Sequence, residues 1–430
     1  MKRIIFIFTF FFIIFLFTGM TVPAQEVNYD ESKVPEYTLP DPLVMENGEH
    51  ITSPKAWWNE RRPEILKLFE ENVYGKVPGK LQHITFHTFS VDSKALNGLA
   101  TRKQVSILFT GNNSGTGMDL LIYIPNTGKE PFPAFLGLNF YGNQTIQSDT
   151  GIKITRSWVK NNKAYGITNH QATEASRGAR AYRWPVEMIL KQGYALITAY
   201  YGDIDPDFDD GFQNGVQPLF YKKGQHKPAP DEWGSIAAWA WGLSRALDYL
   251  ETDPDIDAQR VAVMGHSRLG KTALWAAAED QRFALAISSM SGCGGAALSR
   301  RRYGETVERI NTSFPHWFCT NFKKYNDHED SLPVDQHELI ALIAPRPVYI
   351  SAAVEDRWAD PKGMFLAAKY ATPVYRLLRK TGLPENAEMI TGQPVMGTIG
   401  FHMRPGKHDV TNYDWQQFLI FANKFLKNYF

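Results

Sequence analysis

The chain has 430 residues, of which 43% are hydrophobic and 13% aromatic, enough to bury a large core. Its 46 lysines and arginines against 45 aspartates and glutamates give a formal net charge of +1. This balance gives no electrostatic reason to expect nucleic acid or an anionic membrane as a partner.

The first 24 residues have the pattern of a secretory signal peptide. Residues 1–3 give a basic start, residues 4–17 are apolar, and small residues precede Gln25. The apolar run is shorter than the ~20 residues that a membrane-spanning helix needs. Cleavage near Ala24 is therefore favoured over a membrane anchor. We expect a secreted or periplasmic protein with no membrane attachment after cleavage.

Two segments are expected in the mature chain. Residues 25–53 are polar and contain several prolines, which predicts an extended N-terminal arm lying on a catalytic domain of residues 54–430. That domain begins with a helix predicted over 54–74. Strands are then predicted at Val105–Thr110, Leu120–Ile124, Ala134–Asn139, Ala195–Tyr200, Val261–Gly265, Ala284–Ser289, Val348–Ala353 and Gly397–Met403, and helices at Trp184–Gln192, Trp233–Glu251, Lys271–Asp280, Pro361–Arg379 and Thr411–Asn428.

The order of these elements predicts an α/β fold. The first three predicted strands are expected to form a meander, and the later ones, short and continuously apolar, suit a parallel sheet buried on both faces. A mostly parallel central sheet between two helical layers is a three-layer α/β/α sandwich, the plan of the α/β-hydrolase fold. A long insertion is expected between about Gly292 and Pro345.

Ser267 is the candidate nucleophile. It stands between a strand ending at Gly265 and an alanine-rich helix, the context of a nucleophile elbow, where a sharp turn lifts the hydroxyl above the sheet. The usual pattern has glycine two residues after the serine, but this chain has Leu269 there and Gly270 one place later. The alternative is that Ser267 only caps an ordinary helix.

A serine nucleophile needs a neighbouring base. His408 lies in the loop after the last predicted strand, where this fold carries its catalytic histidine. His402 falls within that strand and is expected to be a packed side chain. We therefore predict that His408 is the base.

The acid that orients the histidine normally follows one of the two preceding strands. After the first of them stands Met290, which cannot serve. After the second come Glu355, Asp356 and Asp360, and Asp356 is favoured because it lies where the turn leaves the strand. The order Ser267, Asp356, His408 is that of the triads of this fold.

Five motifs together resemble the glucuronoyl esterases of carbohydrate esterase family fifteen, in their bacterial form. They are GLNFYGN at 137–143, GHSRLGK at 265–271, SGCGG at 291–295, EDRWADP at 355–361 and RPGKHD at 404–409. The resemblance implies hydrolysis of esters of glucuronic acid, often 4-O-methylated, that link xylan to lignin. Many members carry a glutamate just before SGxGG, where this chain has Met290, so the resemblance leaves the acid to Asp356, as in some bacterial members.

The resemblance also implies roles for residues around the nucleophile. Arg268 matches the arginine that faces the oxyanion, where a positive charge would stabilise the tetrahedral intermediate. Lys271 and Trp358 match residues that contact the sugar, and Glu305 falls near another sugar-contacting position. The alternatives are a surface arginine, a helix-terminal lysine, a core tryptophan and a solvated glutamate.

Other features carry weaker predictions. Cys293 and Cys319 permit a disulfide but imply no zinc site. Asp203–Gly211 resembles a calcium loop without its final glutamate, so no metal is predicted. The arginines at 177, 180 and 183 could reach an acidic substrate, although a solvated face is favoured.

The predicted protein is a monomer that needs no cofactor and acts on lignin–glucuronoxylan esters. The nearest alternative is an acetyl xylan esterase or another serine esterase of the same fold. A serine peptidase would be expected to carry a propeller-length domain, and an inactive carbohydrate-binding protein would not need the triad.

Overall fold

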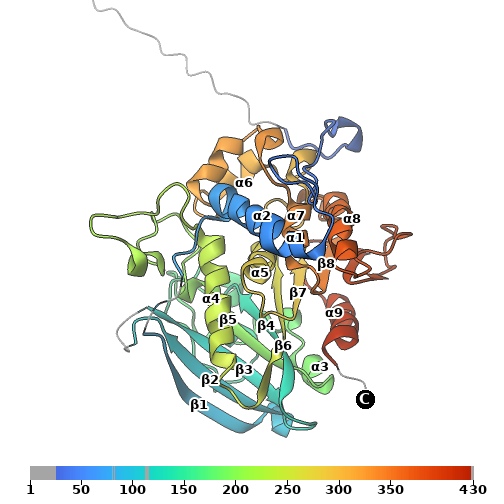
Figure 1. Cartoon of the computed structure of the whole chain (residues 1–430). Coiled ribbons are helices and arrows are strands. Elements are labelled where there is room, and N and C mark those ends of the chain that lie inside the picture. Colours follow the sequence, from blue (N-terminus) through green and yellow to red (C-terminus); the bar gives the residue numbers. More distant parts are fainter. Residues whose placement is uncertain (1–25, 80, 82, 112–115, 428–430) are drawn as a thin grey trace, which may run out of the picture.

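A computed structural model of the chain describes residues 26–79, 81, 83–111 and 116–427 (Figure 1). The predicted signal peptide, residues 1–24, lies outside this part. Within the described residues, no helix has both the length and the apolar character needed to cross a membrane.

A single mixed sheet runs through the molecule. The strand order is β1-β2-β3-β5-β4-β6-β7-β8-β10-β9. Neighbours from β5 across to β10 are parallel, whereas β1, β2, β3 and β5 pair antiparallel in succession. The strands are β1 (Thr85–Ala95), β2 (Ala100–Leu108), β3 (Gly117–Pro125), β4 (Phe132–Asn139), β5 (Ala195–Tyr200), β6 (Ile256–His266), β7 (Leu285–Ser289), β8 (Val348–Ala353), β9 (Val395–Met396) and β10 (Ile399–Arg404).

The predicted meander is partly wrong. It consists of β1, β2 and β3, and β1 was not predicted because most of its side chains are exposed or only half-buried and give no apolar run. The third predicted strand, β4, does not join the meander, since β5 inserts between β3 and β4. The remaining predicted strands are confirmed to within a few residues.

Helices cover both faces of the sheet, which confirms the predicted three layers (Figure 1). One core contains side chains of α4, α5, α7 and α8, and the other those of α3 and α9. Alternation along β3 sends Ile122 into the first core and Leu121 into the second. The helices are α1 (Pro54–Ala56), α2 (Arg62–Phe69), α3 (Val186–Lys191), α4 (Ser235–Leu250), α5 (Arg268–Glu279), α6 (Val307–Ser313), α7 (Gln336–Ile343), α8 (Pro361–Leu377) and α9 (Asn412–Leu426).

The helix predicted over 54–74 is confirmed as one continuous helical segment. It includes α1 and α2 and two π-helical stretches, Trp57–Arg61 and Glu70–Tyr74. The predicted insertion lies between β7 and β8 and carries α6 and α7.

The N-terminal arm packs on the insertion. The Gly304 N–H donates to the Asn28 carbonyl at 2.9 Å, and Arg301 pairs with Glu31 at 2.7 Å.

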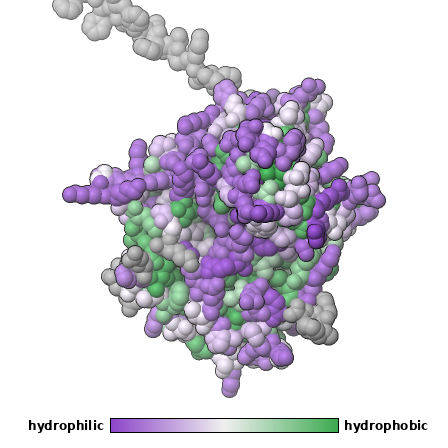
Figure 2. Space-filling view, in the orientation of Figure 1, coloured by the Kyte–Doolittle hydropathy of each residue, from purple (hydrophilic) through white to green (hydrophobic). Residues whose placement is uncertain are grey.

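Hydrophilic residues cover much of the molecular surface seen in Figure 2, with smaller hydrophobic areas between them. The division into signal peptide, arm and catalytic domain stays a prediction.

Parallel strands bring their carboxyl ends to one edge of the sheet. The segments after β4, β6, β7, β8 and β10 therefore meet there. These segments hold the residues that the sequence singled out.

Candidate active site

Ser267 occupies a strained turn between β6 and α5. Its φ of 58° and ψ of −129° lie in a region that residues with a side chain rarely adopt. Gly265 is required, because a Cβ there would lie 1.8 Å from the Leu269 carbonyl oxygen. The Ser267 side chain makes no capping hydrogen bond to α5. The geometry is that of a nucleophile elbow, and Ser267 is no ordinary N-cap.

His408 and Asp356 lie together beside this turn. His408 Nδ1 is 2.6 Å from the Asp356 carboxylate. Asp356 is buried, whereas the His408 side chain is 39% exposed. The His408 ring packs at a tilt of 43° against that of His266, with centroids 4.5 Å apart, which brings it next to the elbow.

The alternative acids and base have other partners. Asp360 pairs with Arg301 at 2.8 Å and caps α8, and Glu355 is exposed to solvent. His402 is fully buried, with Nε2 2.9 Å from Asp414. His402 is thus the packed side chain that its place in the strand predicts.

Met290 leaves no acid after β7. It is buried, and its N–H donates to the Ser351 carbonyl at 2.8 Å. The thioether can neither accept a strong hydrogen bond nor carry charge at this place.

Arg268 is held by a buried carboxylate, Asp207. Besides the Arg268 guanidinium, Asp207 accepts hydrogen bonds from Trp317 Nε1 at 2.7 Å, Tyr201 Oη at 2.9 Å and His316 Nε2 at 3.0 Å. Burial alone would raise the pKa of Asp207, but these donors and the guanidinium hold it well below its usual range. The Arg268 side chain also lies 4.8 Å from the Trp317 ring centroid. Arg268 is therefore fixed, and part of its positive charge is neutralised by Asp207.

Lys271, Glu305 and Trp358 form one cluster. Lys271 Nζ donates to the carbonyls of Ser291 and Cys293 at 2.5 and 2.7 Å and lies 3.6 Å from Glu305. The Glu305 N–H donates to the Trp358 carbonyl at 3.0 Å. Burial raises the pKa of the Glu305 carboxyl, and the Lys271 ammonium opposes that rise. Three residues far apart in sequence thus share one site.

Trp358 is the exposed member of this cluster. It is 38% exposed, so its ring is available to a ligand and is not a core tryptophan. Gly304 permits the approach, since its φ is 66° and a Cβ would lie 2.5 Å from the Trp358 carbonyl oxygen.

Known proteins resemble this chain in sequence and in fold. "Carbohydrate esterase MZ0003" from an unknown prokaryotic organism is 57% identical over 396 residues, 92% of this chain and 91% of the relative. A solved structure described as a promiscuous CE15 esterase from a marine bacterial metagenome superposes with a TM-score of 0.88 at 56% identity, over 93% of this chain and all of that chain. The chain belongs to carbohydrate esterase family 15.

Two further comparisons agree with this assignment. The family model "Glucuronyl esterase, fungi" matches residues 181–379. The glucuronoyl esterase from Solibacter usitatus superposes with a TM-score of 0.87 at 48% identity, over 91% of this chain and 99% of that one. The predicted family and the predicted α/β-hydrolase fold are confirmed.

In this family 15 chain, Asp207 is a site residue that the sequence did not reveal. It lies in the calcium-like run Asp203–Gly211, whose acidic side chains have separate partners. Asp203 accepts from Ser157 Oγ at 2.6 Å, while Asp207 holds Arg268. Among the described residues, no group of three or more histidine, cysteine or acidic side chains could hold a metal. No sequence pattern links Asp207 to Arg268.

The expectation of a solvated arginine face is wrong. Arg177 pairs with Glu174 at 2.6 Å and donates to the Ile152 carbonyl at 2.6 Å. Arg183 pairs with Asp409, next to His408. Arg180 is 7% exposed. Arg180 and Arg183 line a pocket together with His266, whereas Arg177 does not.

The two cysteines are not bridged. Cys293 and Cys319 are both buried free thiols. Burial raises the pKa of Cys319 to about 11, so its thiol stays protonated and poorly nucleophilic at neutral pH.

Proposed function

We propose that this chain is a serine-type glucuronoyl esterase that cleaves esters of glucuronic acid or 4-O-methyl-glucuronic acid, as in lignin–glucuronoxylan linkages. The observation that carries the proposal is the Lys271–Glu305–Trp358 cluster, whose Lys271 lies one helical turn after the strained Ser267. A charged and aromatic surface at that distance suits an acyl group that is a polar sugar acid. The names of the relatives, glucuronoyl esterase among them, support the same activity.

The proposed reaction has two steps. Asp356 orients His408 through Nδ1, which leaves Nε2 to take the Ser267 proton as the hydroxyl attacks the uronoyl carbonyl. The resulting imidazolium then gives its proton to the alcohol as the C–O bond breaks. Water, deprotonated by His408, attacks the acyl-enzyme, and the uronic acid leaves.

The oxyanion is proposed to lie at the N-terminus of α5. The first backbone N–H groups of a helix have no acceptor within the helix, so the Arg268 N–H is available. The guanidinium of Arg268 adds a second donor. Because Asp207 fixes that guanidinium beforehand, little reorganisation is needed when charge develops.

A broader serine esterase is the second candidate. It is favoured by the relative described as promiscuous, which is 56% identical to this chain. Both Trp358 and the His408 side chain are partly exposed, so neither would block acyl groups smaller than a sugar acid from reaching the site. Acetyl esters of xylan are the alternative substrates.

A substrate panel separates the two candidates. It compares kcat/KM for methyl glucuronate, methyl 4-O-methyl-glucuronate and 4-nitrophenyl acetate. Because 4-nitrophenolate leaves far more readily than methoxide, each kcat/KM is divided by the rate constant of the uncatalysed hydrolysis of that ester. The proposal expects this ratio to be higher for the uronate esters than for the acetate. Hydrolysis of the acetate alone would reject it.

The cellular setting is proposed from the N-terminus. Residues 1–24 are proposed to be removed on export, which gives a secreted or periplasmic enzyme. We also propose that the mature chain acts as a monomer, with residues 25–53 as its arm. N-terminal sequencing of the exported protein, with a start at Gln25 expected, and light scattering test these points.

A further inference from the structure

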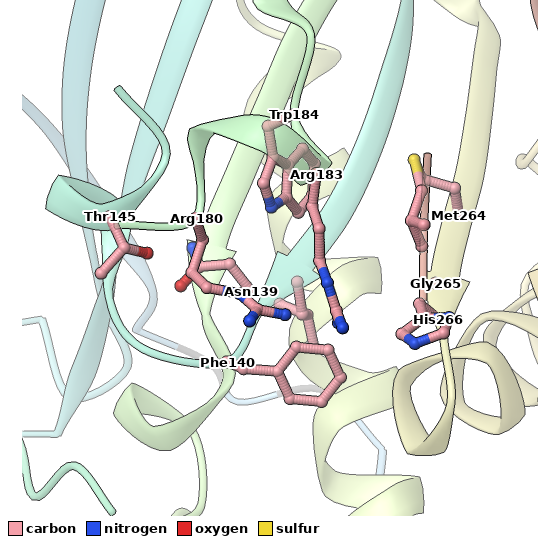
Figure 3. Close-up of a pocket in the computed structure, with 11 residues that line it drawn as sticks. Asn139, Phe140, Thr145, Arg180, Arg183, Trp184, Met264, Gly265 and His266 are labelled. Carbon is pink, nitrogen blue, oxygen red and sulfur yellow. The ribbon is translucent and has the colours of Figure 1, made fainter. Parts of the chain in front are cut away.

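A small, partly open pocket of about 30 Å³, enough for a carboxylate group, lies next to the elbow on the side away from the Lys271 cluster. Phe140 follows β4 and His266 ends β6, and both line it (Figure 3). In the sheet, β4 lies on one side of β6, whereas β7 and β8, which lead to the cluster, lie on the other. The other lining residues are Leu138, Asn139, Thr145, Arg180, Arg183, Trp184, Met264, Gly265 and Val410.

Arg180 carries a charge that the described residues do not neutralise. It is only 7% exposed, and it forms no ion pair with any carboxylate in the described part of the chain. Its Nη1 donates to the Tyr165 hydroxyl, and its guanidinium lies 5.0, 5.1 and 5.7 Å from the ring centroids of Tyr182, Tyr165 and Tyr141. A buried cation without a counterion is costly, so such a cation in a pocket indicates an anionic ligand.

The other polar groups of the pocket fit the same ligand. Arg183 extends into the pocket opposite His266, and its charge is balanced by Asp409 (Figure 3). His266 is 5% exposed, and its Nε2 is buried with no hydrogen-bond partner among the described residues. Burial, with the nearby His408 and arginines, lowers the pKa of His266 well below its usual range, so the ring is neutral. A neutral imidazole can donate from Nε2 to an anion.

We propose that Arg180, with His266, binds a carboxylate carried by the alcohol half of the ester. The inference rests on the proposed function, which places the uronoyl half against Lys271 and Trp358. The alcohol half then leaves on the opposite side of Ser267, where Arg180 lies. A carboxylate a few bonds from the ester oxygen would pair with the guanidinium. The enzyme should therefore hydrolyse esters of anionic alcohols with a higher kcat/KM than esters of neutral alcohols of the same size.

A matched pair of substrates tests the inference. Glucuronate esters of 3-hydroxypropanoate and of 3-hydroxypropanamide have nearly the same shape and differ in charge. Because hydrogen bonds to charged groups contribute more than neutral ones, we expect the carboxylate ester to be preferred by about tenfold in kcat/KM. Arg180→Gln should bring the ratio close to one, and Arg180→Lys, which keeps the charge, should retain part of the preference.

Controls separate the possible causes. Arg156 is exposed and does not line this pocket, so Arg156→Gln removes the same charge and should leave the ratio unchanged. Melting temperatures of the Arg180 variants show whether they fold. Sodium acetate is added as a free carboxylate during hydrolysis of the amide ester. If acetate slows wild type but not Arg180→Gln, and the two esters have equal kcat/KM in wild type, the pocket binds free carboxylates. That result would overturn the assignment to the alcohol.

Two results would count against the inference directly. A wild-type ratio of one or less, with no effect of acetate, rejects an anion site. An unchanged preference in folded Arg180→Gln rejects Arg180 as its ligand. If methyl glucuronate is not hydrolysed either, the proposed function itself is wrong, and this inference fails with it.

Discussion

Asp356 and His408 are 52 residues apart in sequence, yet the Asp356 carboxylate lies 2.6 Å from His408 Nδ1. Two backbone hydrogen bonds fix this approach. The Val354 N–H donates to the Arg404 carbonyl and the Glu355 N–H to the Gly406 carbonyl, both at 3.0 Å. The loops after β8 and β10 are thereby joined just before Asp356 and His408. The pair is positioned by backbone as well as by side chains.

Replacing Asp356 tests its role as the orienting acid. Asp356→Asn keeps the size of the side chain but removes the negative charge, so His408 is no longer held in the tautomer that accepts the Ser267 proton. We expect kcat to fall by about 10³- to 10⁴-fold with little change in KM. Glu355→Gln changes the exposed neighbouring carboxylate and should keep wild-type kcat. Equal losses in both variants would contradict the assignment.

Trp358 is expected to bind the sugar. Trp358→Ala removes an exposed ring beside Glu305, so KM for methyl glucuronate should rise by about tenfold, the ~1.4 kcal/mol typical of one aromatic contact. Hydrolysis of 4-nitrophenyl acetate should change little, because the acetyl group does not reach the ring. Tyr370→Ala removes a similarly exposed ring on α8 as a control. An equal loss on both substrates would mean that Trp358 supports the fold only.

Asp207 is expected to act through Arg268. Asp207→Asn removes the charge that holds the guanidinium, so we expect kcat to fall by about tenfold, less than the ~10²- to 10³-fold cost of losing an oxyanion donor. The unfolding temperature should also fall, because the half-buried Arg268 loses its counterion. Asp209→Asn, at an exposed position of the same run, should change neither quantity. A normal kcat in Asp207→Asn would mean that catalysis does not depend on Asp207 holding the Arg268 guanidinium.

Asp205 predicts a pH dependence of stability. It is 1% exposed, and burial raises its pKa from 3.8 to about 7. Between about pH 4 and pH 7 the unfolded state loses this proton while the folded state keeps it, so the contribution to the free energy of unfolding is present at low pH and lost as pH rises through 7. Asp205→Asn removes the titrating carboxyl group and, with it, this pH-dependent contribution to the free energy of unfolding.

The measurement is the melting temperature of both proteins at two pH values. The difference, variant minus wild type, should be more positive at pH 8 than at pH 4.5, by roughly 2 to 4 °C. Groups that titrate in both proteins cancel in this comparison. A difference that does not change with pH would mean that Asp205 is ionised in the folded state throughout that range.

Some parts of the fold follow from the sequence because each depends on a short segment. The apolar runs of β6, β7 and β8 predict a buried parallel sheet, and the rule that its carboxyl ends meet at one edge brings Asp356 toward His408. The strand β1 gives no such signal, since most of its side chains face solvent. The place of β5 between β3 and β4 depends on pairing between segments distant in the chain.

Within the site, local patterns identify residues but not their partners. The elbow motif points to Ser267 and, through the family resemblance, to Arg268 and Lys271. It does not reveal that Asp207 pairs with Arg268, because the two residues are 61 positions apart in the chain. The spacing of the acidic run instead resembles a calcium loop. Arg180 likewise has the sequence context of a surface residue, and only its burial shows otherwise.

Hydrolysis of methyl glucuronate by Ser267→Ala tests the central claim most directly. If Ser267 forms the acyl-enzyme, its loss should reduce kcat by about 10³-fold or more, with the protein folded and the melting temperature near that of wild type. Ser148→Ala, which changes an exposed serine, should keep full activity. Residual turnover by Ser267→Ala within about tenfold of wild type would contradict the mechanism.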